Sequence, residues 1–205
     1  MDDMTEKHAA VDVSRLPTVV FDTRGLMWWG TMAFIVIEGW TLALTAMAYF
    51  YLRQNSPAWP PHRTAEPDLL LPTINLVLLL VSLIPAWIAA KAAERLERRR
   101  TSLWLAVNGI MGVAALVLRW YELWDTNTRW DTTAYGSIVW LLAGLHGTLI
   151  LLDVGDTVGI SLKLTRKDAP PHYLADATDY AMYWLFTVAS WIPIYLLIYV
   201  APRFI

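Results

Sequence analysis

Residues 26–52 read LMWWGTMAFIVIEGWTLALTAMAYFYL, a run long enough to cross a membrane as one helix. Its single charged residue is Glu38, near mid-length, where an ionised group costs from roughly 3 to more than 10 kcal/mol. Thr31, Thr41 and Thr45 share a helical face with Glu38, because they lie three or seven residues from it. We expect this polar face to point toward protein and the other faces to point toward lipid. The other faces carry Ile35, Val36, Ile37, Trp40, Leu42, Leu44 and Met47.

Four more apolar blocks of membrane-spanning length follow this first one. They cover residues 69–91, 102–120, 135–160 and 179–201. With 57% hydrophobic and 17% charged residues, the composition is that of a membrane protein and leaves no room for a large soluble domain. We therefore predict an all-α integral membrane protein with a five-helix domain in residues 26–205. The polar tail of residues 1–25 lacks the pattern of a cleaved signal peptide, so we expect the first span to direct insertion.

Basic residues predict the topology, because cytoplasmic loops are enriched in Lys and Arg. The connections after the second and fourth spans carry Lys91, Arg95, Arg98, Arg99, Arg100, Lys163, Arg166 and Lys167. The opposite side is poorer, with Arg53, Arg63, Arg119 and Arg129. We expect a cytoplasmic N-terminus, a C-terminus outside in the periplasm, and an aromatic belt at each membrane surface. The outer belt would contain Trp59, Trp120, Tyr121, Trp124 and Trp130, and the inner belt Trp28 and Trp29.

Glycines within the spans predict close contacts between helices. Gly109 and Gly112 lie in the third span, and Gly155 and Gly159 form a small-xxx-small pair near the end of the fourth. Packing is the simpler interpretation of all four.

Cofactor ligands are scarce in the spans. His146 is the one histidine within a span, whereas His8, His62 and His172 belong to the tail or the loops. A haem held by two histidines therefore has no ligand pair here, and no spacing favours ligation by His146 with Met111 or Met182. The absence of cysteine excludes disulfides and thiolate metal sites. We expect no metal, haem or other redox cofactor bound by this chain alone.

Polar residues in the fourth span allow two interpretations. His146 and Asp153 share a helical face, and Asp156 and Thr157 follow one turn later. This line is either a proton or ion relay or, as we prefer, a set of interhelical hydrogen bonds with solvated aspartates near the headgroups. Glu38 is either a neutral acid or an ionised one, and an ionised Glu38 needs a donor such as His146 or a neighbouring subunit.

Arg95, Arg98, Arg99 and Arg100 are candidates for binding anionic lipid headgroups. Their simplest role is to fix the orientation of the chain in the membrane.

Each span carries a short motif. The motifs are Trp29-Gly30 with Glu38; Pro72-Thr73-Ile74-Asn75 with Ser82; Arg119-Trp120-Tyr121-Glu122; Tyr135-Gly136-Ser137 with Gly144-Leu145-His146-Gly147; and Tyr183-Trp184 with Trp191. In this order, over residues 27–200, they resemble subunit III of the haem–copper oxidases in its five-helix form. Glu38 falls on the mid-helix carboxylate of that family. Four positions depart from the family pattern: Leu149, Leu185 and Val188 replace polar residues, and Arg119 replaces a glutamine.

The resemblance implies an accessory subunit of a respiratory terminal oxidase that takes electrons from cytochrome c or quinol. Haem and copper would reside in the partner subunit, and the neighbours would be catalytic subunit I, subunit II and phospholipids in a bacterial inner membrane, with no nucleic acid. The chain would support stability and proton uptake through a polar core of Glu38, Glu122, His146 and Asp153.

Other functions stay open from the sequence. The chain is alternatively a subunit III-like component of a nitric oxide reductase or an oxidase assembly factor. A different class is a small self-contained transporter of protons or ions that uses Glu38, His146 and Asp153. Transporters often carry internal repeats and broken helices, and neither is visible here.

Overall fold

The computed structural model describes residues 19–62 and 64–204 of the chain. Most of the predicted polar tail, including His8, and the predicted loop cation Arg63 lie outside the described residues. Five α-helices in the described part are long and apolar enough to cross a membrane, and this part contains no strand. The predicted fold class is confirmed. The helices are α1 (Leu26–Gln54), α2 (Leu70–Glu94), α3 (Arg98–Trp124), α4 (Ala134–Thr165) and α5 (His172–Tyr195).

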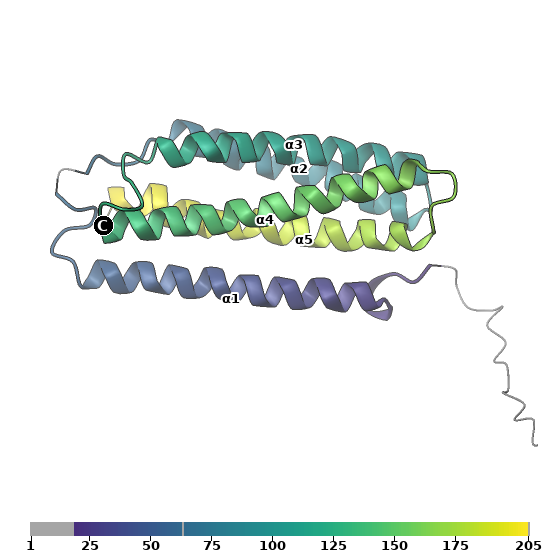
Figure 1. Ribbon diagram of the computed structural model, residues 1–205, viewed down its shortest axis with the longest axis horizontal. Helices are drawn as coiled ribbons and strands as arrows, with labels where there is room; N and C mark the ends of the chain where they lie inside the picture. Colours follow the sequence, from purple (N-terminus) through teal and green to yellow (C-terminus); the bar gives the residue numbers. More distant parts are fainter. Residues whose placement is uncertain (1–18, 63, 205) are drawn as a thin grey trace, which may run out of the picture.

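The helices lie side by side along one long axis (Figure 1). Helix α2 packs on α3 and α5, helix α3 packs on α4, and α1 lies along α4 and α5. Short helical turns flank the bundle: the 3-10 turn Asp22–Arg24 precedes α1, and α5 continues as the π-helical segment Leu196–Val200 and the 3-10 turn Ala201–Arg203.

Helix α1 is the least buried of the five. Its buried residues are Leu42, Thr45 and Tyr49, whereas Thr41 is exposed. The helical face that meets the bundle is therefore rotated from the predicted one, which placed Leu42 toward lipid and Thr41 toward protein. Thr41 remains satisfied because its hydroxyl donates to the carbonyl of Ile37, one turn back.

Small residues allow α3 to approach α4 closely. A Cβ at Gly109 would lie 3.0 Å from Val158 Cγ2, and one at Gly112 would overlap a methyl group of Val154. Gly155 and Gly159 behave differently, since no atom of a neighbouring helix in the described part lies within 4 Å of either Cβ position. The prediction that this glycine pair marks a helix contact is wrong for contacts within the described part of the chain.

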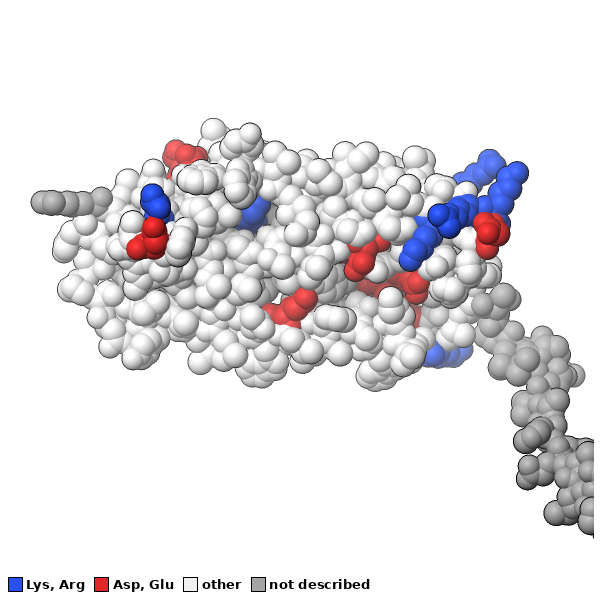
Figure 2. Space-filling view, viewed as in Figure 1, with Lys and Arg blue, Asp and Glu red and all other residues white. Residues whose placement is uncertain are grey.

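Charged and aromatic residues divide the bundle into two ends. The Arg-rich end carries the α2–α3 and α4–α5 connections and gathers most of the cations visible in Figure 2. The Trp-rich end carries the α1–α2 and α3–α4 connections, and its exposed rings include Trp120, Tyr121, Trp124 and Trp130. Trp59 does not join these exposed rings, because it packs edge-on between Tyr49 and Tyr135 at centroid distances of 5.3 and 5.1 Å.

Helix α4 begins at a defined capping residue. The Thr133 hydroxyl accepts a hydrogen bond from the backbone N–H of Gly136 at 3.0 Å, which satisfies one of the free donors of the first turn. This cap marks the start of α4, the helix that carries His146 and Asp153.

Candidate functional site

A groove of about 270 Å³ runs between α1, α4 and α5 in the Arg-rich half of the bundle. Its apolar walls come from Met27, Gly30, Thr31, Phe34 and Leu152. We name it the acidic groove, because Glu38, Asp156 and Asp179 also line it, together with Tyr180 and Tyr183. Figure 2 shows acidic side chains along the middle of this face, where nearly all other surface is uncharged.

Glu38 lies half-buried in the acidic groove and is paired with a tyrosine. The Tyr183 hydroxyl donates to Glu38 Oε2 at 2.5 Å, which joins α1 to α5. His146, one of the two donors considered for an ionised Glu38, contacts Arg119 and the Thr187 backbone instead. Tyr183 was part of a recognised motif, but nothing in its spacing indicated which acid it would contact.

Asp153 lies next to the acidic groove but is closed off from solvent. It is 1% exposed, and its polar side-chain neighbour is Thr157, one turn further along α4. Its strongest charged neighbours are two further acids, Asp156 and Glu38. Asp156 is exposed as expected, whereas the placement of Asp153 in solvent is wrong.

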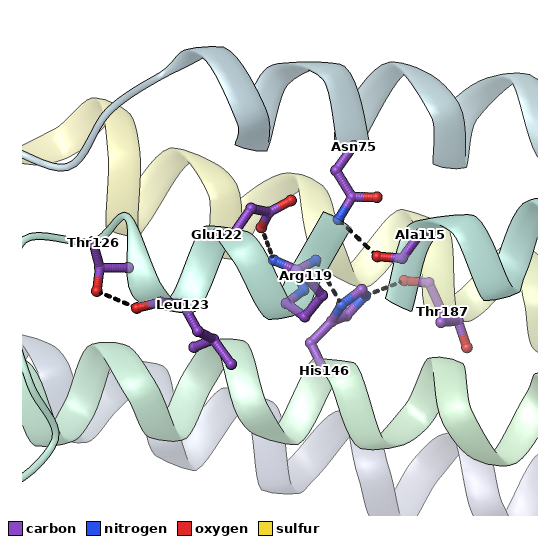
Figure 3. Close-up of polar contacts among 8 residues, drawn as sticks. All are labelled: Asn75, Ala115, Arg119, Glu122, Leu123, Thr126, His146 and Thr187. Atoms are coloured by element: carbon purple, nitrogen blue, oxygen red, sulfur yellow. Dashed lines mark hydrogen bonds and ion pairs between the residues drawn. The ribbon is translucent and has the colours of Figure 1, made fainter. Parts of the chain in front are cut away.

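A second polar site lies in the interior, nearer the Trp-rich end (Figure 3). Arg119 Nη1 donates to Glu122 Oε2 at 2.5 Å, and the two side chains are 3% and 0% exposed. Arg119 is therefore half of a buried ion pair and not the loop cation that we expected. The i, i+3 spacing of the two opposite charges was the sequence signal for this pair.

His146 joins three helices at this ion pair. Its Nδ1 lies 3.3 Å from Arg119 Nη2, and its Nε2 lies 2.9 Å from the backbone oxygen of Thr187. A guanidinium only donates and a carbonyl only accepts, so Nδ1 accepts, Nε2 carries the proton and the ring is neutral. The ring also stacks on Trp191 at 4.7 Å, and the Arg119 guanidinium lies 3.3 Å from the centroid of the same indole.

The two polar sites are not connected to each other. In the residues that the structure describes, no hydrogen bond links His146 to Asp153, although both are buried on α4. Leu149, Ile150 and Val188 are buried in the surrounding hydrophobic core. Two of these, Leu149 and Val188, are positions where the family pattern would have polar side chains.

The Arg-rich end forms a third feature, a hollow of about 610 Å³ between the α2–α3 and α4–α5 connections. Arg98 donates to the backbone oxygens of Arg166 and Lys167, which ties the two connections together. Arg100 pairs with Glu97 at 3.2 Å. The cations that line the hollow are Arg98, Arg99, Arg100, Arg166 and Lys167, so two residues join the predicted group and exposed Arg95 lies outside the lining.

Ligands for a metal ion do not converge in any of these places. Within residues 19–62 and 64–204, no three His, Cys, Asp or Glu side chains are grouped so that they could hold one.

Comparison with known proteins gives one consistent result. The sequence is 28% identical over 183 residues to cytochrome c oxidase subunit 3 of Synechocystis sp., covering 85% of this chain and 75% of that protein. It is 27% identical over 179 residues to cytochrome c oxidase subunit 3 of Thermostichus vulcanus, covering 85% of this chain and 87% of that one. No family model matches the sequence.

Proposed function

These relatives support placing the chain in the haem–copper oxidase subunit III family, and from that premise we propose that it is an accessory subunit of a terminal oxidase. The chain is a multi-pass membrane protein with five spanning helices in its described part. The observation that carries the proposal is the state of His146, the one histidine inside the bundle. Both of its ring nitrogens are engaged, by Arg119 and by Thr187, so neither is available as an axial ligand.

Redox chemistry then belongs to the partner, and this chain binds and positions. We expect catalytic subunit I and subunit II as neighbours, with haem and copper held outside this chain. The bacterial relatives support a bacterial inner membrane. The cations of the Arg-rich end support a cytoplasmic location for that end, because basic residues favour the cytoplasmic side. Phosphate headgroups of phospholipids fit the chemistry of the hollow there.

The acidic groove supports a role in supplying protons. Glu38, Asp153, Asp156 and Asp179 gather in the Arg-rich half, and the groove lining contains no Lys or Arg. Ionisable side chains at membrane depth often mark proton pathways, because an unpaired charge there is costly. The acidic groove would deliver protons to the catalytic subunit from the Arg-rich side.

The alternative functions have less support. A self-contained transporter that uses Glu38, His146 and Asp153 needs a polar path between them, whereas buried leucine, isoleucine and valine side chains surround the gap. The relatives are named as oxidase subunits, which does not favour a nitric oxide reductase component or an assembly factor.

Purification in mild detergent tests the accessory role. We expect a haem-bearing chain to co-purify with this protein, and its consistent absence would contradict the proposal. The isolated chain should show no haem spectrum, since His146 is occupied on both sides.

A substitution in the acidic groove tests the proton role. Glu38→Gln should assemble normally, because the amide still accepts a hydrogen bond from Tyr183, but the oxidase should lose activity faster during sustained turnover. The matched control is Glu94→Gln, an exposed acid of the Arg-rich end that pairs with Lys91. If the wild-type and Glu38→Gln complexes lose oxidase activity at the same rate during sustained turnover, Glu38 has a packing role only.

A further inference from the structure

We propose that the interior of the bundle around the Arg119–Glu122 pair is a binding site for ordered water molecules. This inference is independent of the function proposed above. It begins from polar atoms that have no hydrogen-bond partner among the described residues: Asn75 Oδ1, Arg119 Nε, Glu122 Oε1, Tyr135 Oη, Thr187 Oγ1, Trp191 Nε1 and Tyr199 Oη. All seven side chains belong to buried residues. Asn75 also interacts with the Glu122 carboxyl group. Buried polar groups are almost always satisfied in native proteins, so the atoms that such side-chain contacts leave unpaired require another partner.

The atoms form one cluster and are not scattered through the bundle. Tyr199 interacts electrostatically with Glu122, Arg119 and Tyr135. Its ring centroid lies 6.4 Å from that of Trp191. The Arg119 guanidinium lies over the same Trp191 ring. The cluster therefore draws side chains from α2, α3, α4, α5 and the segment that follows α5.

Local backbone geometry brings Tyr199 into this cluster. The chain changes from α- to π-helical geometry at Leu196–Val200, and Tyr199 is 1% exposed within that segment. π-helical turns are rare and frequently mark functional sites. Here the turn places a hydroxyl group in the interior of the bundle without a protein partner.

The mixture of donors and acceptors selects the ligand. Trp191 Nε1 and Arg119 Nε only donate, whereas Glu122 Oε1 and Asn75 Oδ1 only accept. A metal cation would meet the Arg119 charge, and an anion would meet the Glu122 charge. A small neutral molecule that both donates and accepts hydrogen bonds can pair with the donor atoms and with the acceptor atoms. Water is such a molecule, and a buried water commonly makes about three hydrogen bonds.

Hydroxyl-radical footprinting by X-ray radiolysis, read by mass spectrometry on the intact membrane complex, tests the proposal. Bound water beside a buried ring is converted to a local radical, so a hydrated ring is modified despite its burial. Trp184 is the internal control, because it is 1% exposed and its Nε1–H donates to Ser82 Oγ at 2.8 Å. We expect Tyr199 and Trp191 to be modified several-fold faster than Trp184. Rates equal to that of Trp184 would overturn the proposal.

A variant pair gives a second, separate test. Tyr199→Phe removes the hydroxyl at nearly constant shape and should reduce the modification of Trp191 several-fold. The matched control is Tyr195→Phe on the same stretch, whose hydroxyl is already paired with Thr73 at 2.8 Å, and it should leave Trp191 unchanged. Unchanged modification of Trp191 in Tyr199→Phe would also overturn the proposal. The wild-type comparison of Trp191 with Trp184 stands whether or not either variant folds.

Discussion

Removal of Arg119 tests the energetics of the interior ion pair. In Arg119→Leu the Glu122 carboxylate loses its donor at 2.5 Å while it remains 0% exposed. Breaking one side of a buried pair costs about 3–5 kcal/mol, because the remaining charge is left without compensation. The variant also loses the guanidinium over Trp191 at 3.3 Å, a cation–π contact of about 0.5–2 kcal/mol. We expect the free energy of unfolding to fall by about 4 kcal/mol or more.

The assay is reversible unfolding of the full chain in mixed micelles, by titration with a denaturing detergent and tryptophan fluorescence. The matched control is the double variant Arg119→Leu/Glu122→Leu. Replacing both members of a buried pair with apolar residues is often neutral, so the double variant should be more stable than the single one. A loss below about 1 kcal/mol in Arg119→Leu, or an equal loss in the two variants, would refute the reasoning.

Three further substitutions and one control test helix packing, one helix cap and one buried hydrogen bond in the same assay. Gly112→Ala should lower the free energy of unfolding by about 1–3 kcal/mol, because its Cβ overlaps Val154 of α4. Gly155→Ala is the control and should leave that free energy unchanged, because no atom of a neighbouring described helix lies within 4 Å of its Cβ position. Equal effects of the two substitutions would contradict the α3–α4 packing. Thr133→Ala should lose about 1 kcal/mol through the cap of α4, and no loss would mean that the cap contributes nothing. Ser82→Ala should lose about 1–3 kcal/mol, because the buried Trp184 Nε1–H loses its acceptor; a neutral result would indicate another acceptor.

The fold could be predicted because membrane-spanning length and apolar composition are properties of each segment alone. The rotation of a helix about its axis is not such a property. Thr41 and Leu42 illustrate this: the polar periodicity around Glu38 pointed to one face of α1, and packing against α4 and α5 buries an adjacent face. The apolar side chains of α1 can pack equally well against lipid or against protein. Hydropathy therefore does not indicate which face of α1 contacts the bundle.

The site was only partly predictable for the same reason. Glu38 could be identified as a polar core residue because charges are rare within spans, whereas Glu122 lay beyond the predicted third span and was identified only through the family resemblance. Their partners depend on which helices become neighbours. Tyr183 reaches Glu38 from a helix about 145 residues later in the chain, and no local pattern records that contact. Arg119, by contrast, lies on the same helix as Glu122 at i, i+3, and that spacing alone indicates that the two side chains can pair.

His146 has a mechanical consequence for the subunit. Through its two nitrogens one imidazole ring braces α4 to α3 and to α5, and the indole of Trp191 clamps the ring and the guanidinium together. We therefore expect these three helices to move together as one block. Helix α1 is attached to the block through few buried side chains and the bond between Glu38 and Tyr183. We expect α1 to separate from the bundle before α3, α4 and α5 separate from one another, because fewer of its side chains are buried.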